Sequence, residues 1–174
     1  MISRSKARES VYKLIYEFLF LKKQNKKSLS IFLSADLAEK DRDYISDTYF
    51  GVIEKYDSLI EIIASHLKNF TIDRLVKADL AALVLAIYEM LYIPHIPIEV
   101  SICEAVELVK TFSTEKSKQF VNGVLASISK IIASGESKTN QPQSDDNADV
   151  SLTADLNHDS LPVNPTDDSN CNLN

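Results

Sequence analysis

The residues of this chain that could do chemistry are an aromatic ring, an amide, a glycine and two lysines within one short segment. The five residues are Phe120, Asn122, Gly123, Lys116 and Lys118. An aromatic ring can stack on a nucleobase while a lysine meets a phosphate, and a glycine leaves the approach to the ring open. A helix that only packs does not require this combination, so the segment predicts an RNA-binding site.

Periodicity alone leaves two interpretations of Phe120 open. At 100° per residue, the ring lies roughly 95° from the centre of the apolar stripe of its helix, which also fits a residue at the edge of the core. Gly123 favours the RNA-binding interpretation. A glycine inside a helix costs about 1 kcal/mol relative to alanine, and such a cost calls for a compensating reason.

The N-terminal segment is basic. Residues 1–27 carry eight basic and two acidic side chains, and the first three basic residues are Arg4, Lys6 and Arg8. Such a density of positive charge attracts polyanions, because each neutralised phosphate releases counterions. The alternative is an ordinary solvated helix start. Cations at a helix N-terminus oppose the helix dipole, and this local penalty favours a bound anion.

The same segment places aromatic rings among its basic residues. Helical geometry puts Tyr12, Lys13, Tyr16 and Phe20 roughly opposite the apolar stripe of the first helix. A solvated face of this kind suits base stacking with phosphate contacts, or the docking of a partner protein. The alternative is a neighbouring helix that covers these rings.

Patterns of catalysis and metal binding are absent from the sequence. It contains neither a glycine-rich phosphate loop nor a nucleophile elbow, and His66, His95 and His158 are isolated from one another. Glu104 and Glu107 fall three residues apart, a spacing that is more typical of surface or structural carboxylates than of an acid–base pair. We therefore predict a protein without enzymatic activity, cofactor or metal ion.

The elements that position these residues are predicted to be helices only. The sequence has three glycines and no run in which apolar and polar residues alternate as in a half-buried strand. The apolar period predicts helices over about 5–21, 28–37, 41–67, 71–92, 97–112 and 114–132. The helix that ends at Tyr92 is the most apolar, so we expect it to be central and buried.

The charge pattern divides the chain into two parts. From Ser134 to the end there are eight acidic residues and one lysine, a net charge of −7, which leaves +1 for the rest. The segment contains no aromatic residue and is rich in Asp, Asn and Ser, so it cannot bury enough apolar surface to fold. We predict a helical domain over 1–133 and a disordered acidic tail over 134–174.

Cellular setting follows from what the sequence does not contain. Cys103 and Cys171 make neither a disulfide framework nor a zinc site, which would need clustered ligands. No apolar run reaches the roughly 18–20 residues that span a membrane, and the N-terminus has no signal-peptide pattern. The prediction is a cytoplasmic protein that does not bind membranes.

Several motifs occur in an order that resembles one known family, the bacterial transcription antitermination factor NusB. The similarity runs in register from about Arg4 to Ile131. Its strongest parts are Ala7-Arg8-Glu9, His66-Leu-Lys-Asn-Phe70, Leu85-Ala-Ile-Tyr-Glu-Met-Leu91, Val100 to Phe112, and Phe120-Val-Asn-Gly123.

The resemblance implies a fold, partners and site residues. The fold is two small perpendicular helical bundles. The partners are boxA RNA of ribosomal RNA leaders, the ribosomal protein NusE, and the elongating RNA polymerase with other Nus factors. A homodimer of the free protein is also compatible with it. The implied roles are an RNA-binding arm with a nearby tyrosine, a stacking ring and an acidic partner surface: Arg4, Lys6, Arg8 and Tyr16; Phe120; Asp73 and Asp79.

The sequence also departs from the family. Its arm holds fewer arginines than many members, Leu80 and Val84 stand where basic residues are common, and the acidic tail is unusual. These departures define an alternative function, a scaffold that recruits NusE and has weakened RNA binding.

Overall fold

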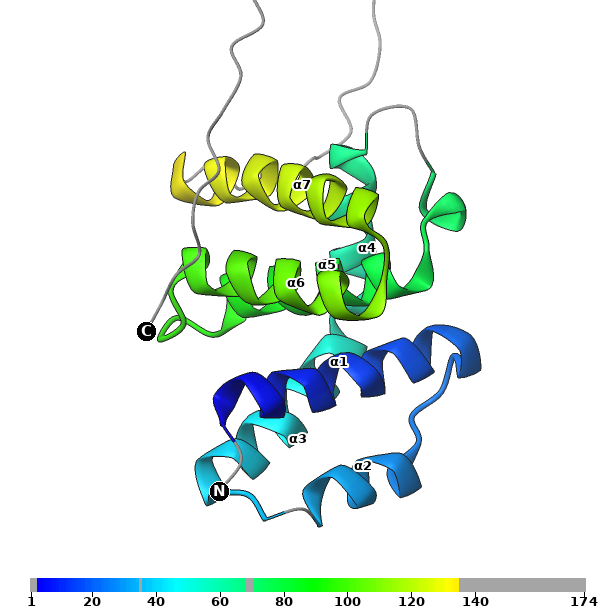
Figure 1. Cartoon of the computed structure of the whole chain (residues 1–174), viewed down its shortest axis with the longest axis vertical. Helices are drawn as coiled ribbons and strands as arrows, with labels where there is room; N and C mark the ends of the chain where they lie inside the picture. The colour runs from blue at the N-terminus through cyan, green and yellow to red at the C-terminus, as the bar shows by residue number, and fades with distance from the viewer. Residues whose placement is uncertain (1–2, 35, 68–70, 135–174) are drawn as a thin grey trace, which may run out of the picture. The chain divides into compact units, whose positions relative to one another are not determined.

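In a computed structural model, the described residues 3–34, 36–67 and 71–134 form seven α-helices, one 3-10 turn and no strand. The elements are α1 (Arg4–Leu21), α2 (Lys26–Leu33), α3 (Glu39–Glu54), α4 (Tyr56–His66), the turn η1 (Ile72–Arg74), α5 (Lys77–Tyr92), α6 (Ile98–Phe112) and α7 (Glu115–Ser134). In Figure 1, α1 to α3 form a lower group and α6 and α7 lie above it. The all-α prediction is confirmed. The predicted acidic tail lies outside the described residues, except for Ser134.

Side-chain caps fix where the first two helices begin. The Ser3 hydroxyl accepts a hydrogen bond from the Lys6 N–H at the start of α1. The Asn25 carboxamide accepts from the Lys27 and Ser28 N–H groups at the start of α2. Both caps satisfy backbone donors that have no partner within the helix. They start α1 one residue, and α2 two residues, earlier than the apolar period alone predicts.

The single long helix predicted over 41–67 is wrong, because the chain breaks at Lys55 into α3 and α4. Lys55 has φ −96° and ψ 9°, which lies between the helical and extended regions. The break lets α3 pack on α1 and α5 while α4 packs on α5 and α7. Periodicity does not reveal it, because apolar residues resume the helical spacing directly after the bend.

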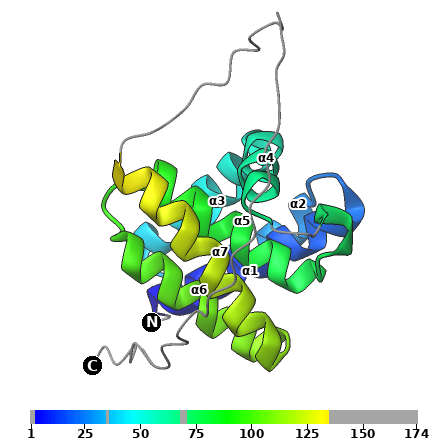
Figure 2. The ribbon, with the colours of Figure 1, turned by 90° about the horizontal axis from the view of Figure 1, so that it is seen from above.

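Helix α5 is the centre of the core, as the sequence predicts. It contacts α1, α3, α4, α6 and α7, and α7 lies over α5 and α6 when the ribbon is seen from above (Figure 2). The eight consecutive residues 80–87 are each at most 1% exposed. A helix buried on all sides has no polar face, which explains the apolar run in the sequence.

Helices α3 and α5 approach closely at a glycine. A Cβ atom at Gly51 would overlap the ring and the hydroxyl of Tyr88. The missing side chain therefore lets the Tyr88 ring lie directly on the backbone of α3. Gly51 thus has a packing role that is absent at the second glycine in the described helices, Gly123 on α7.

A buried ionic cluster joins α1, α3, α5 and α6. Arg8 on α1 is 3% exposed, and its Nε donates to Glu89 Oε1 on α5 at 2.8 Å. The Arg8 Nη1 atom lies 3.1 Å from Glu104 Oε2 on α6. The Tyr44 hydroxyl on α3 also donates to Glu89 Oε1. The buried Glu89 carboxylate links α5 to α1 and α3, and Arg8 links α1 to α6 through Glu104.

The charges in this cluster stabilise one another. Burial alone would lower the pKa of Arg8, but the negative charge of Glu89, together with Tyr44 and Glu104, outweighs it and raises that pKa. Burial and the neighbouring Glu89 carboxylate raise the pKa of the Tyr44 hydroxyl. The arginine therefore stays charged and the tyrosine stays protonated. Arg8 was predicted to bind RNA; because its side chain is buried and paired, we correct its role to a structural one.

Replacing Glu89 with alanine should lower the free energy of unfolding by about 3–5 kcal/mol, the usual cost of breaking a buried ion pair from one side. The physical reason is that Arg8 would remain buried with only the partly exposed Glu104 as a counter-charge. Urea denaturation followed by far-UV circular dichroism measures the change.

The matched control is Glu107→Ala on α6. Glu107 is exposed and forms an ion pair with Lys110, three residues along the helix, and such surface pairs contribute less than about 1 kcal/mol. Similar losses in the two variants would contradict the structural role of the buried cluster.

Candidate nucleic-acid interface

Phe120 lies at the edge of the buried face of α7. The buried residues of that face are Val121, Val124, Leu125 and Ile128. Phe120 is half-buried and packs against the core. Phe120 is therefore partly a residue of the core edge and partly accessible to a ligand, so its position fits both interpretations that periodicity allows.

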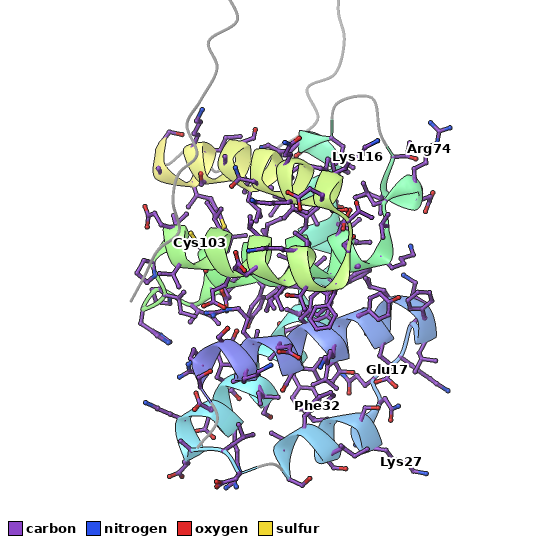
Figure 3. All side chains as sticks on the ribbon, in the orientation of Figure 1. Glu17, Lys27, Phe32, Arg74, Cys103 and Lys116 are labelled. Atoms are coloured by element: carbon purple, nitrogen blue, oxygen red, sulfur yellow. The ribbon has the colours of Figure 1, made fainter. Side chains whose placement is uncertain are left out.

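Two surface hollows flank the Phe120 ring. The first, of about 280 Å³, is lined by Phe120 with Arg74, Val76 and Lys116 among others. The second, of about 350 Å³, is lined by Phe120 with His66, Leu67, Gln119, Gly123, Val124 and Ser127. Arg74 and Lys116 point outward at the same end of the molecule (Figure 3). The ring thus separates an open site lined by Arg74, Lys116 and Asp79 from an open site lined by His66 with apolar and small polar residues.

Gly123 is not required by packing. A Cβ atom at this position would meet nothing within 4 Å, and the residue is exposed. The glycine therefore leaves the second hollow without a side chain at this position. The structure brings Lys116, Phe120 and Gly123 together around these hollows. Lys118 and Asn122 lie on the same helix but line neither of the two hollows.

Only part of the aromatic face of α1 is exposed. Tyr12 is 2% exposed because α6 covers the first half of α1, and its ring stacks on Phe112 with centroids 5.2 Å apart. Burial, with the nearby charge of Asp79, raises the pKa of its hydroxyl. Tyr16 and Phe20, further along α1, are 40% and 59% exposed. The expectation of a solvated face is wrong for Tyr12 and holds for the other two rings.

The basic residues at the start of α1 are compensated by acidic neighbours. Arg4 Nε lies 3.3 Å from Asp41 Oδ1, and its guanidinium lies over the Tyr44 ring. Lys6 and Lys13 each contact Glu9 at 2.7 Å.

These contacts reduce the positive charge that the N-terminal arm has available to bind a phosphate. Hydrogen bonds from Lys13 and Lys6 lower the pKa of Glu9, so Glu9 carries its negative charge at neutral pH. Arg4 lines a hollow with Tyr88 and Tyr92 that is separate from those beside Phe120.

The two predicted partner-binding aspartates differ in exposure. Asp73 on η1 is exposed. Asp79 on α5 is 4% exposed and accepts a hydrogen bond of 2.6 Å from the Ser113 hydroxyl, which also contacts Ser117. Asp79 therefore holds the α6–α7 turn against α5, and we correct its role to this structural one.

The two glutamates of α6 have different partners. Glu104 pairs with Arg8 and accepts from the Ser5 hydroxyl, whereas Glu107 pairs with Lys110, so the two act separately. Arg74 on η1 and His66 on α4 line the hollows. From the sequence, His66 is named only as an isolated histidine and within a family motif, and Arg74 is not singled out, because no local pattern signals that either side chain reaches the site from another element. Among the described residues, no group of acidic, histidine or cysteine side chains is arranged to hold a metal ion. No helix in these ranges has both the length and the apolar composition of a membrane span.

Known proteins are similar to this chain in sequence. The NusB family model matches residues 5–130. Transcription antitermination protein NusB of Ruminiclostridium cellulolyticum is 38% identical over 144 residues, which cover 82% of this chain and 99% of the relative. The protein of the same name from Methylacidiphilum infernorum is 40% identical over 136 residues, covering 75% and 92%. The resemblance inferred from the motifs is confirmed.

Solved structures share the fold. NusB of T. maritima aligns with a TM-score of 0.70 and 32% identity over 74% of this chain and 92% of that chain. A chain from a crystal structure of antitermination factors NusB and NusE in complex with double-stranded RNA aligns with a TM-score of 0.66 over 73% and 96% of the chains. Its identity is 24%, so this second likeness shows the fold alone.

Replacing Gly123 with alanine should raise the free energy of unfolding by about 0.5–1 kcal/mol. Alanine has the better helix propensity, and the space around the new methyl group is open. Thermal or urea denaturation measures the change.

Gly51→Ala is the matched comparison, a second glycine inside a helix whose new methyl group would overlap Tyr88. It should destabilise the protein. Two changes of the same sign would contradict the different roles assigned to the two glycines.

Proposed function

The chain belongs to the NusB family, and we propose that it is a transcription antitermination factor that binds boxA-type RNA of ribosomal RNA leaders together with ribosomal protein NusE. In this role it joins the elongating RNA polymerase with other Nus factors. The names of the relatives support the role. The observation that carries the RNA-binding part is the half-buried Phe120 ring between two open hollows, with Lys116 on one side and Gly123 on the other.

The proposed RNA contacts divide into stacking and charge. Phe120 offers a ring face to a base, and the open position of Gly123 gives the base room. Lys116 and Lys118, and at the other end of the face Arg4, Lys6, Lys13 and Tyr16, complete the set, with Asn122 as a polar contact. Asp73 is the proposed contact to NusE. The protein acts without enzymatic activity and in the cytoplasm.

The charge pairing in α1 favours a second candidate function. Arg8 is buried, and Arg4, Lys6 and Lys13 each contact an acidic side chain. Such pairing reduces the attraction for phosphate, so the chain could serve as a scaffold that recruits NusE with weakened RNA binding. Titration of boxA RNA and scrambled RNA, with and without NusE, separates the two functions. Preference for boxA supports the first, and NusE binding without that preference supports the second.

Phe120→Ala should weaken binding to boxA RNA by about 1–3 kcal/mol, the range for the loss of one stacking aromatic ring. Fluorescence anisotropy with labelled RNA measures the affinity, and circular dichroism checks the fold. Ile131→Ala, an exposed apolar residue on the same helix, is the control and should bind normally. A variant at position 120 that melts early but binds RNA normally would show that the ring is only part of the core.

Replacing Lys6 and Lys13 together with alanine should flatten the salt dependence of RNA binding. Each contact to single-stranded phosphate adds about 0.7 to the magnitude of the slope of log K against log salt, so the loss of two contacts should reduce that magnitude by about 1.4. Affinities for different RNA sequences should fall alike, because phosphate contacts carry no base information. Lys55 and Lys130, which are not part of the proposed RNA-binding set, are replaced as the control pair. An unchanged slope in the first variant would remove these lysines from the interface.

A further inference from the structure

A strip of positive charge begins where α1 ends. Its four lysines, Lys22, Lys23, Lys26 and Lys27, fall within six residues and are all exposed. Residues 18–35 contain no acidic side chain. In Figure 3, Lys27 points away from the body of the protein. This group is separate from the arm at the other end of α1.

Exposed aromatic rings connect this lysine group to the proposed RNA-binding face. The Phe20 ring is 59% exposed and lies edge-on to Tyr16, with centroids 5.1 Å apart. Tyr16 in turn lies 6.5 Å from the Tyr12 ring, which stacks on Phe112. We call Phe20 with the four lysines the α1 strip. It continues the proposed RNA face along α1.

The acidic side chains of α1 already have hydrogen-bond or ion-pair partners outside the α1 strip. Glu17 Oε1 accepts hydrogen bonds from the Asn25 carboxamide at 2.7 Å and from the Ser28 hydroxyl at 3.0 Å. Figure 3 shows Glu17 between α1 and α2. Glu9, further back on α1, contacts Lys6 and Lys13. Among the described residues, Lys23, Lys26 and Lys27 form no ion pair, whereas the Lys22 ammonium donates to the Tyr56 hydroxyl at 3.4 Å and lies over that ring. The charge of the three lysines is therefore available to a ligand, in contrast to the paired arm.

Three of the four lysines occupy backbone positions that are unfavourable for a lysine. Lys22 has a φ of 54°, the left-handed conformation that usually takes glycine or asparagine at a helix end. Lys26 and Lys27 stand in the first turn of α2, which has no acidic residue, so their charges oppose the helix dipole. Both features oppose folding slightly. A bound polyanion would compensate for the charge.

We propose that the α1 strip binds a single-stranded stretch of RNA that flanks the boxA element, without reading its sequence. The inference rests on the proposed function and extends it. The lysines contact phosphates and Phe20 stacks on a base, which is the combination that binds single strands with little sequence preference. An RNA ligand is favoured over a protein because the unpaired charge is uniformly positive and lies beside exposed ring faces. The consequence is a longer RNA footprint than boxA alone.

The test compares boxA RNA with boxA RNA extended by about eight uridines at the 3′ end or at the 5′ end. The intact protein should bind one of the extended RNAs at least about fivefold more tightly at low salt, as one stacked base alone can provide. The gain should shrink as salt rises. Replacing Lys23, Lys26 and Lys27 with alanine should abolish most of the gain and leave the affinity for boxA alone unchanged.

Two more variants separate the contributions of base stacking, charge and backbone strain. Phe20→Ala should reduce the gain without changing the salt slope, because it removes stacking and no charge. Lys22→Gly removes a charge while relieving the left-handed backbone, so it should melt no earlier than the parent and still reduce the gain.

The outcomes separate the two proposals. Equal affinity of the intact protein for boxA and for both extended RNAs would overturn the inference while leaving the proposed function standing. Absence of boxA binding by the intact protein, with and without NusE, would overturn the proposed function itself. If the triple lysine variant binds every RNA normally but binds NusE less tightly, the α1 strip is a protein interface and the inference is wrong.

Discussion

The buried carboxylate of Glu89 is the interaction on which the rest of the structure depends. It accepts hydrogen bonds from Arg8 and Tyr44, and Glu104 is a second carboxylate beside the arginine. These four side chains come from α5, α1, α3 and α6. A buried charge is costly unless its partners are placed well, so the cluster penalises any arrangement of these helices that separates them. It thereby fixes how α1 lies against the core and where its two exposed ends point.

The orientation of α1 decides which of its residues can reach a ligand. With Arg8 turned into the core and Tyr12 covered by Phe112, the first half of α1 is largely a packing element. The second half has one face on the core and carries Tyr16 and Phe20 on the surface. Basic residues occur at both ends of the helix, but those at the start contact Asp41 and Glu9. The number of basic residues is therefore a poor guide to the RNA affinity of this segment.

Some features could be predicted from the sequence because they depend on local pattern or on one helix at a time. The central place of α5 follows from its apolar run, and the edge position of Phe120 follows from helical geometry. The cost of a glycine inside a helix calls for a reason other than helix stability, and packing does not supply one, because a Cβ atom at Gly123 would meet nothing within 4 Å. The bend at Lys55 was not predicted, because the apolar period continues through it. Arg8 and Asp79 were misassigned because a charged side chain in a sequence does not reveal its buried partner, which here lies 81 residues away for Arg8 and 34 for Asp79.

The two ends of α1 also show how folding and binding place different demands on the same kind of residue. A charge that stabilises the fold must have a partner, as Arg8 has in Glu89, and a paired charge offers little to a polyanion. A charge that binds a polyanion gains most when its surroundings offer it no counter-charge, as for Lys23, Lys26 and Lys27 among the described residues. Lys22 adds the argument from backbone strain, because a left-handed residue with a side chain persists only where something else favours it. Unpaired charge, exposed rings and a strained backbone residue coincide at one end of one helix, and together they locate the surface that the fold has left free for a ligand.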